Sequence, residues 1–163
     1  MRIFSEFIVL HEDGPMPEPE QFCPSFWRAE HTDSDGDYYY DGIAGRWTDL
    51  QITREQPRGS DRARLTVKTY YANNRLYEPG DANTDDLRRF LDYLARGRFR
   101  AVPAVTAIRS PAVTEIRLET LDFADYREFL ESVHGFLVHS HGVVVNIGDL
   151  DAAGFRAEFL DAE

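Results

Sequence analysis

The densest group of chemically active side chains in this sequence lies between Asp33 and Asp41. These nine residues contain four aspartates, three consecutive tyrosines and no basic residue. Clustered carboxylates attract cations and basic proteins, and tyrosine rings bury apolar area while keeping a polar hydroxyl group. The pattern predicts a surface that binds a basic protein, with a nearby tryptophan as a further anchor. The predicted partner-binding residues are Trp27, Asp33, Asp35, Asp37, Tyr38, Tyr39, Tyr40 and Asp41.

The same segment partly matches a calcium-binding EF-hand loop. Counted from Asp33, aspartates occupy positions 1, 3, 5 and 9 of such a loop. Position 6 is Tyr38 instead of glycine, and position 12 is Ala44 instead of the bidentate glutamate. Three interpretations remain: a looser calcium site, a solvated turn around Gly36, and a partner-binding surface. We predict no bound metal. In a strand, Tyr39 would point opposite to its neighbours and into the core.

A second candidate site consists of three histidines, His134, His139 and His141. On a strand, His139 and His141 would share a face and chelate zinc with a nearby carboxylate, Asp149 or Asp151. On a helix, they would lie about 200° apart and would not share an ion. We favour the helix, which makes these histidines structural residues near its C-terminal end.

Two further groups of reactive side chains have simpler interpretations. Cys23 would need a base, such as His11 or His31, to act as a nucleophile, and we expect a buried small side chain instead. The run Arg96 to Arg100 alternates arginine with glycine and phenylalanine, but the chain as a whole is acidic, so we predict no nucleic-acid binding. No P-loop, GxGxxG, GxSxG or HExxH motif is present, and no cofactor is predicted.

Composition places these candidates in a folded, acidic protein. The 163 residues carry a net charge of −11, distributed as −7 over residues 1–60, +4 over 61–111 and −8 over 112–163. This length predicts a single domain spanning residues 1–163. A single cysteine fits a reducing compartment, and no signal peptide or membrane-length apolar run is seen, so we expect a cytoplasmic protein without membrane contact.

Hydrophobic periodicity predicts an α+β fold: a mostly antiparallel sheet, strand-rich in the N-terminal half, with about three helices packed on one face. Residues 2–10 are expected to form a central strand, and residues 47–54 and 62–72 a hairpin. The other expected strands are 99–108, 113–120 and 143–147, and the expected helices are 84–97, a helix starting at Asp122, and 151–160.

These observations predict a small, non-enzymatic binding protein whose acidic segment recognises a basic partner. One role that fits is an immunity or inhibitor protein that neutralises a basic, nuclease-like bacterial toxin. A metal-dependent enzyme using His134, His139 and His141 is the alternative, and a structural or oligomeric protein is the second. The sequence leaves the oligomeric state open.

Overall fold

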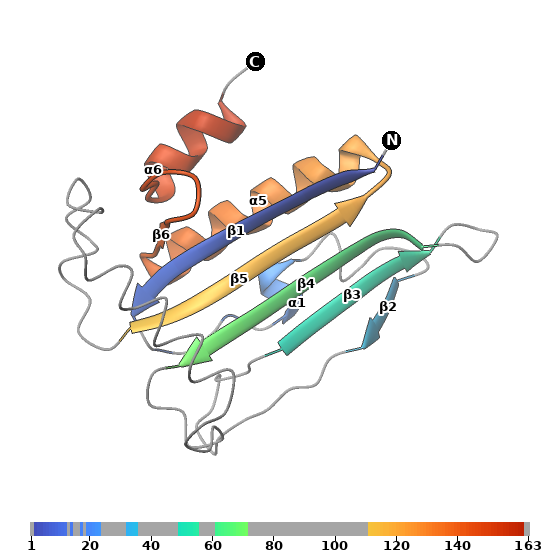
Figure 1. Ribbon diagram of the computed structural model, residues 1–163, viewed down its shortest axis with the longest axis horizontal. Coiled ribbons are helices and arrows are strands. Elements are labelled where there is room, and N and C mark those ends of the chain that lie inside the picture. The colour runs from blue at the N-terminus through green and yellow to red at the C-terminus, as the bar shows by residue number, and fades with distance from the viewer. Residues whose placement is uncertain are drawn as a thin grey trace.

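The computed structural model describes residues 2–12, 14, 17, 19–23, 32–35, 49–55, 61–71 and 111–161 (Figure 1). These residues form one six-stranded sheet in the order β2-β3-β4-β5-β1-β6, and every neighbouring pair is antiparallel. The strands are β1 (Ile3–Glu12), β2 (Thr32–Asp35), β3 (Asp49–Glu55), β4 (Asp61–Tyr71), β5 (Pro111–Thr120) and β6 (Val143–Val144). The helices are α1 (Pro19–Phe22), α5 (Phe123–Ser140), α6 (Ala152–Phe155) and the π-helical turn η1 (Arg156–Leu160).

Alternating side chains give the sheet one apolar face and one polar face. In β4, Ala63, Leu65 and Val67 are buried, whereas Arg64 between them is exposed and Lys68 is partly exposed. Because strand residues alternate between faces with a period of two, this pattern buries one side and leaves the other in water. The buried side of β1 and β5 packs against α5, which lies behind both strands in Figure 1.

The sequence fixes the start of helix α5 through an aspartate cap. The Asp122 carboxylate accepts a hydrogen bond from the Ala124 backbone N–H at 2.8 Å. This bond satisfies one of the amide donors that the first helical turn leaves unpaired. The helix ends at His141, which adopts a left-handed conformation with φ of 54°. The buried side chains of α5 recur at helical spacing: Asp125, Phe129, Leu130, Ser132, Val133, Phe136 and Leu137.

A group of aromatic rings joins the sheet to both helical segments. Phe7 of β1 stacks on Phe129 of α5, with ring centroids 5.6 Å apart. The same ring meets Phe155 and Phe159 edge-on, at 5.1 Å and 5.3 Å. Burial of rings this large is a major apolar contribution to folding. Phe7 therefore holds α5 and the C-terminal α6–η1 segment on the same face of the sheet.

The predicted α+β class is confirmed, and the sheet is antiparallel throughout its described part. The 47–54 and 62–72 hairpin is confirmed as β3 and β4, and the helix after Asp122 is confirmed as α5. The 151–160 helix is confirmed as α6 continuing into η1, and the predicted 143–147 strand shortens to β6. The predicted helix 84–97 and strand 99–108 lie outside the described residues.

The predicted central strand at residues 2–10 is confirmed as β1, which lies between β5 and β6. Its pairing with β6 is short, because β6 meets it only at Val9 and Leu10. The apolar residues of β1 that lie outside this stretch include Phe4, which keeps 59% of its surface exposed. A run of apolar residues does not by itself distinguish a fully flanked strand from one that is open along part of one edge.

Candidate functional site

The acidic segment begins on the outermost strand of the described sheet. Asp33 and Asp35 belong to β2, where their backbones pair with Thr53 and Gln51 of β3. Among the described strands, β2 has a neighbour on one side only. Within the described sheet, Asp33 and Asp35 therefore lie on an edge strand, and the backbone of an edge strand is accessible to a second molecule. The remaining predicted partner-binding residues, Trp27, Asp37, Tyr38, Tyr39, Tyr40 and Asp41, lie outside the described residues.

The three histidines of the alternative site follow the helix, as favoured from the sequence. His134 and His139 belong to α5, and His141 caps its C-terminus. Successive helical residues turn by about 100°, so these side chains point in different directions. In the part of the chain that the structure describes, no three His, Cys, Asp or Glu side chains lie close enough to hold a metal ion. The alternative zinc geometry, which required His139 and His141 on one strand, therefore does not arise, because His139 lies on α5.

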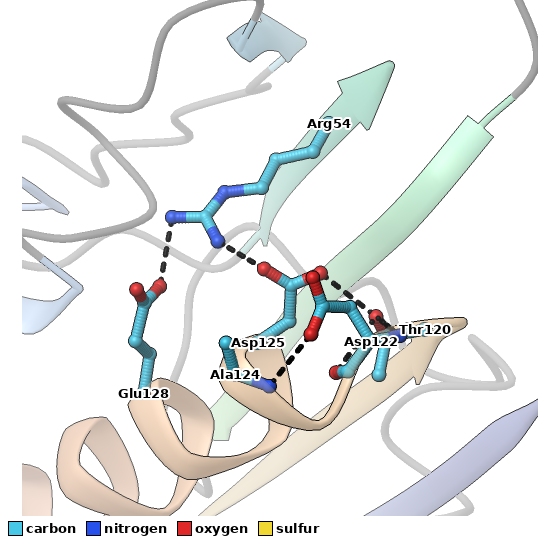
Figure 2. Close-up of polar contacts among 6 residues, drawn as sticks. All are labelled: Arg54, Thr120, Asp122, Ala124, Asp125 and Glu128. Atoms are coloured by element: carbon cyan, nitrogen blue, oxygen red, sulfur yellow. Dashed lines mark hydrogen bonds and ion pairs between the residues drawn. The ribbon is translucent and has the colours of Figure 1, made fainter. Parts of the chain in front are cut away.

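Sequence reasoning missed a cluster of charged side chains beneath the first turn of α5 (Figure 2). Arg54 of β3 forms ion pairs with Asp125 and, at 2.8 Å, with Glu128. The exposed fractions of the Arg54 and Asp125 side chains are only 4% and 1%. Because removing one partner would leave a buried charge, the pair fixes the helix on the sheet. No local sequence pattern indicated this cluster, because it joins a strand and a helix that lie 71 residues apart in sequence.

Thr120 extends this cluster to the end of β5. Its hydroxyl group donates to the second carboxylate oxygen of Asp125 at 2.8 Å. The backbone N–H of Asp122 donates in turn to the Thr120 hydroxyl oxygen at 3.0 Å. The cluster thus ties together β3, the β5–α5 turn and the start of α5 (Figure 2). Charge-assisted hydrogen bonds of this kind favour rigid positioning of the groups they join.

A second buried polar group connects three strands under the other end of α5. The Nδ1–H of His11 donates to the Glu12 carbonyl oxygen at 2.9 Å, since a carbonyl can only accept. The Nε2 atom of His11 then accepts from the Thr114 hydroxyl at 2.7 Å, and Thr114 contacts the Thr69 hydroxyl at 2.9 Å. The result is a chain of hydrogen bonds from β4 through β5 to β1.

Burial keeps His11 neutral. The side chain is 2% exposed, and desolvation lowers its pKa from 6.5 to about 4. The charge of nearby His139 acts in the same direction, whereas the hydrogen bond to the Glu12 carbonyl opposes the shift. A neutral imidazole is the form that this hydrogen-bond chain requires, because Nε2 must accept. His11 is therefore a structural residue at neutral pH.

Cys23 is buried, as expected from the sequence. Its side chain is fully inaccessible and lies in the core with Phe22, whose ring meets Phe136 edge-on at 5.3 Å. Reactive cysteines need an exposed, electropositive environment that stabilises the thiolate. This position instead gives Cys23 the role of a small apolar side chain.

A shallow cavity of about 340 Å³ lies between the end of α5 and the start of α6. It is lined by Leu137, Val138, His141, Gly142, Asp151, Ala152 and Ala153. The Asp151 carboxylate is already engaged as the cap of α6, where it accepts from the Gly154 N–H at 2.8 Å. The lining is mostly apolar and lacks the convergent polar groups that orient a substrate.

The fold and these sites define an α+β protein with an antiparallel sheet covered by helices on one face. In comparisons with protein-family models, with curated proteins and with solved structures, no match to this chain was found. Within the described residues, no helix has both the length and the apolar character needed to cross a membrane.

Proposed function

We propose that this chain is a small acidic protein that binds a basic protein through the segment from Asp33 to Asp41. The observation that carries the proposal is the density of carboxylates and tyrosines in that segment, with no basic residue among them. Interfaces draw much of their affinity from a few aromatic anchors, while charge complementarity speeds encounter and selects the partner.

The position of β2 supports this proposal. Asp33 and Asp35 lie on the outermost described strand, with β3 as its neighbour on the inner side. The backbone of an edge strand is accessible to a partner in a way that the backbone of a central strand is not. The large buried core behind β3 and β4 supplies the rigid scaffold that a binding surface requires.

A basic nuclease-like toxin is the partner class that suits this chemistry. Proteins that grip nucleic acid carry basic surfaces, because they must neutralise phosphate charges. An inhibitor with a net charge of −11 is attracted to such a surface at long range and competes with nucleic acid for it. On this proposal, the aspartates steer association and Tyr38, Tyr39 and Tyr40, with Trp27, supply the buried contacts.

The proposal is tested by capturing partners from native lysate at about 50 and 300 mM salt. The electrostatic screening length shortens about 2.4-fold between these two concentrations. We expect one basic protein, retained stoichiometrically and more weakly at high salt. If that protein is a nuclease, an equimolar amount of this chain should block its cleavage of nucleic acid. Retention of no basic protein at either salt concentration would contradict the proposal.

A charge-matched pair of variants then locates the surface. Changing Asp33, Asp35, Asp37 and Asp41 together to asparagine should slow association about tenfold and flatten its salt dependence. The control changes four acidic residues elsewhere by the same total charge: Glu119→Gln, Glu131→Gln, Glu158→Gln and Asp161→Asn. If the two variants slowed association equally, the association rate would depend on the net charge of the chain and not on this segment.

A further inference from the structure

Among the described residues, the first half of β1 has no neighbouring strand on the side opposite β5, and we call this side the open edge. The neighbouring strand β6 pairs only with Val9 and Leu10. Beyond that point the Asn146 side chain takes the place of a strand: its Oδ1 accepts from the Ile8 N–H at 3.0 Å and its Nδ2 donates to the Glu6 carbonyl at 2.8 Å. Among the described residues, no strand continues this pairing toward Arg2.

The open edge presents backbone hydrogen-bonding groups in a known direction. The Ile8 carbonyl accepts from the Val145 N–H at 2.9 Å, so the amide groups of Ile8 point away from β5. Alternate residues of a strand point their N–H and C=O groups to the same edge. The amide groups of Phe4 and Arg2, and the N–H of Glu6, therefore point to the open edge as well.

Three large apolar side chains near the start of β1, the end of β5 and the start of α5 are exposed, although Phe4 lies on the face of the sheet opposite α5. Phe4 is 59% exposed, Leu121 is 43% exposed and Phe123 is 69% exposed. The N-terminal end of β1, the end of β5 and the start of α5 lie together in Figure 1. A strand edge whose backbone groups have no neighbouring strand among the described residues, and which carries the exposed Phe4, is a template for pairing with another strand.

The charges of β1 make this edge complementary to itself. When two copies of β1 run antiparallel and centre on Phe4, Arg2 of each copy lies opposite Glu6 of the other. Within one copy, Arg2 pairs with Glu119 at 3.4 Å and Glu6 pairs with Arg117 at 3.0 Å. Pairing would thus extend each existing ion pair into an alternating row of charges across the junction.

We propose that two copies of this chain associate through the β1 edge, around a two-fold axis at Phe4. The two Phe4 residues exchange N–H···O=C bonds, and the N–H of Glu6 donates to the Arg2 carbonyl of the second copy. Asn146 ends the pairing at Glu6, because it already engages that carbonyl. The contact is short, so the dimer is weak and depends on concentration. This inference is independent of the proposed acidic partner surface.

Sedimentation equilibrium of the chain with a free, untagged N-terminus tests the proposal, over about 10 µM to 1 mM protein and at about 0.15 M salt. We expect the mass to rise from monomer to dimer over this range. Arg2→Glu and Glu6→Arg each place like charges opposite one another twice, and each should weaken self-association about tenfold. Mixed together, these two variants restore opposite charges at both positions and should associate with each other.

Two controls distinguish this register from other contacts. Arg127→Glu and Glu131→Arg change the same charges in an exposed pair on α5 and should leave self-association unchanged. Phe4→Pro removes an N–H that points away from β5, so it should block pairing while the monomer stays folded. A monomer at every concentration would overturn the proposal. A dimer whose affinity is unchanged in Arg2→Glu, in Glu6→Arg and in their mixture would overturn it as well.

Discussion

Arg54 and Asp125 form an ion pair in which both side chains are almost fully buried, although they come from a strand and a helix 71 residues apart in sequence. Asp125 also accepts a hydrogen bond from Thr120. Burial of two charges costs solvation free energy, which their attraction and the added hydrogen bonds offset. The main role of the pair is therefore to set the position of α5 on the sheet, and its net contribution to the free energy of unfolding is small.

Removal of one partner should be far more harmful than removal of both. We expect Asp125→Ala to lower the free energy of unfolding by about 3 kcal/mol, because Arg54 would remain buried and poorly compensated. The double variant Arg54→Met with Asp125→Leu should lose less than the sum of the two single changes. Glu131→Gln is the control, since Glu131 lies on the exposed face of α5. Urea unfolding measures Asp125→Ala, the double variant, its two single changes Arg54→Met and Asp125→Leu, and the control, and additive losses in the double variant would contradict the coupling.

Stability should fall as the pH drops below about 6.5, through His11. Its pKa is about 4 in the folded chain and 6.5 when unfolded, so between these values the unfolded chain binds the extra proton. The resulting stability is complete above 6.5, is lost as the pH falls toward 4, and amounts to about 3 kcal/mol at most. His11→Gln should flatten the curve of unfolding free energy against pH in this window. An unchanged slope in that variant would assign the effect to other groups.

The Asn146 side chain should stabilise β1 locally. Asn146→Ala removes both side-chain hydrogen bonds to β1, and we expect a loss of about 1 kcal/mol, since water can replace them. Hydrogen exchange of the Ile8 amide should become faster in this variant. The control, Ile147→Ser, changes an exposed neighbour and should leave that amide unaffected. Equal protection of Ile8 in the parent and in Asn146→Ala would contradict the assignment.

Two glycines should respond in opposite directions to alanine. A Cβ atom at Gly142 would lie 2.6 Å from Cγ1 of Val9 and 3.1 Å from Cβ of His11, so Gly142→Ala should cost about 1 to 3 kcal/mol. Gly135 lies within α5 and has open space at this position, so Gly135→Ala should add about 0.5 to 1 kcal/mol. Thermal unfolding of the two variants checks the contrast, and a shift in the same direction for both would refute it.

The elements with strong local patterns could be predicted from the sequence. The alternation in β4 and the Asp122 cap of α5 both appear where expected, because period and capping are properties of neighbouring residues. The Arg54–Asp125 pair could not be predicted, since it depends on a strand and a helix meeting across 71 residues. The same holds for the hydrogen bonds from Thr69 to His11, which require three strands to be in register.

Less of the candidate site than of the fold could be predicted from the sequence. The strongest indication of the site is the composition of residues 33–41, which are rich in acidic residues and tyrosine. Composition indicates the charge of the partner, but it does not indicate how the contact residues are arranged in space. Placing Asp33 and Asp35 on β2 required the sheet order, which no local pattern contains. The short extent of the β1–β6 pairing could not be predicted for the same reason, because apolar content does not reveal how long a neighbouring strand will be.

The order of strands also has a consequence for synthesis of the chain. Ile3 of β1 pairs with Thr120 of β5, and the same residue of β5 pairs with Ala63 of β4. On a ribosome, β1 is therefore made more than a hundred residues before the strand that joins it to the rest of the sheet. At typical elongation rates this interval lasts about 5 to 20 seconds. Throughout it, the apolar residues of β1 lack the strand with which they pair in the folded protein.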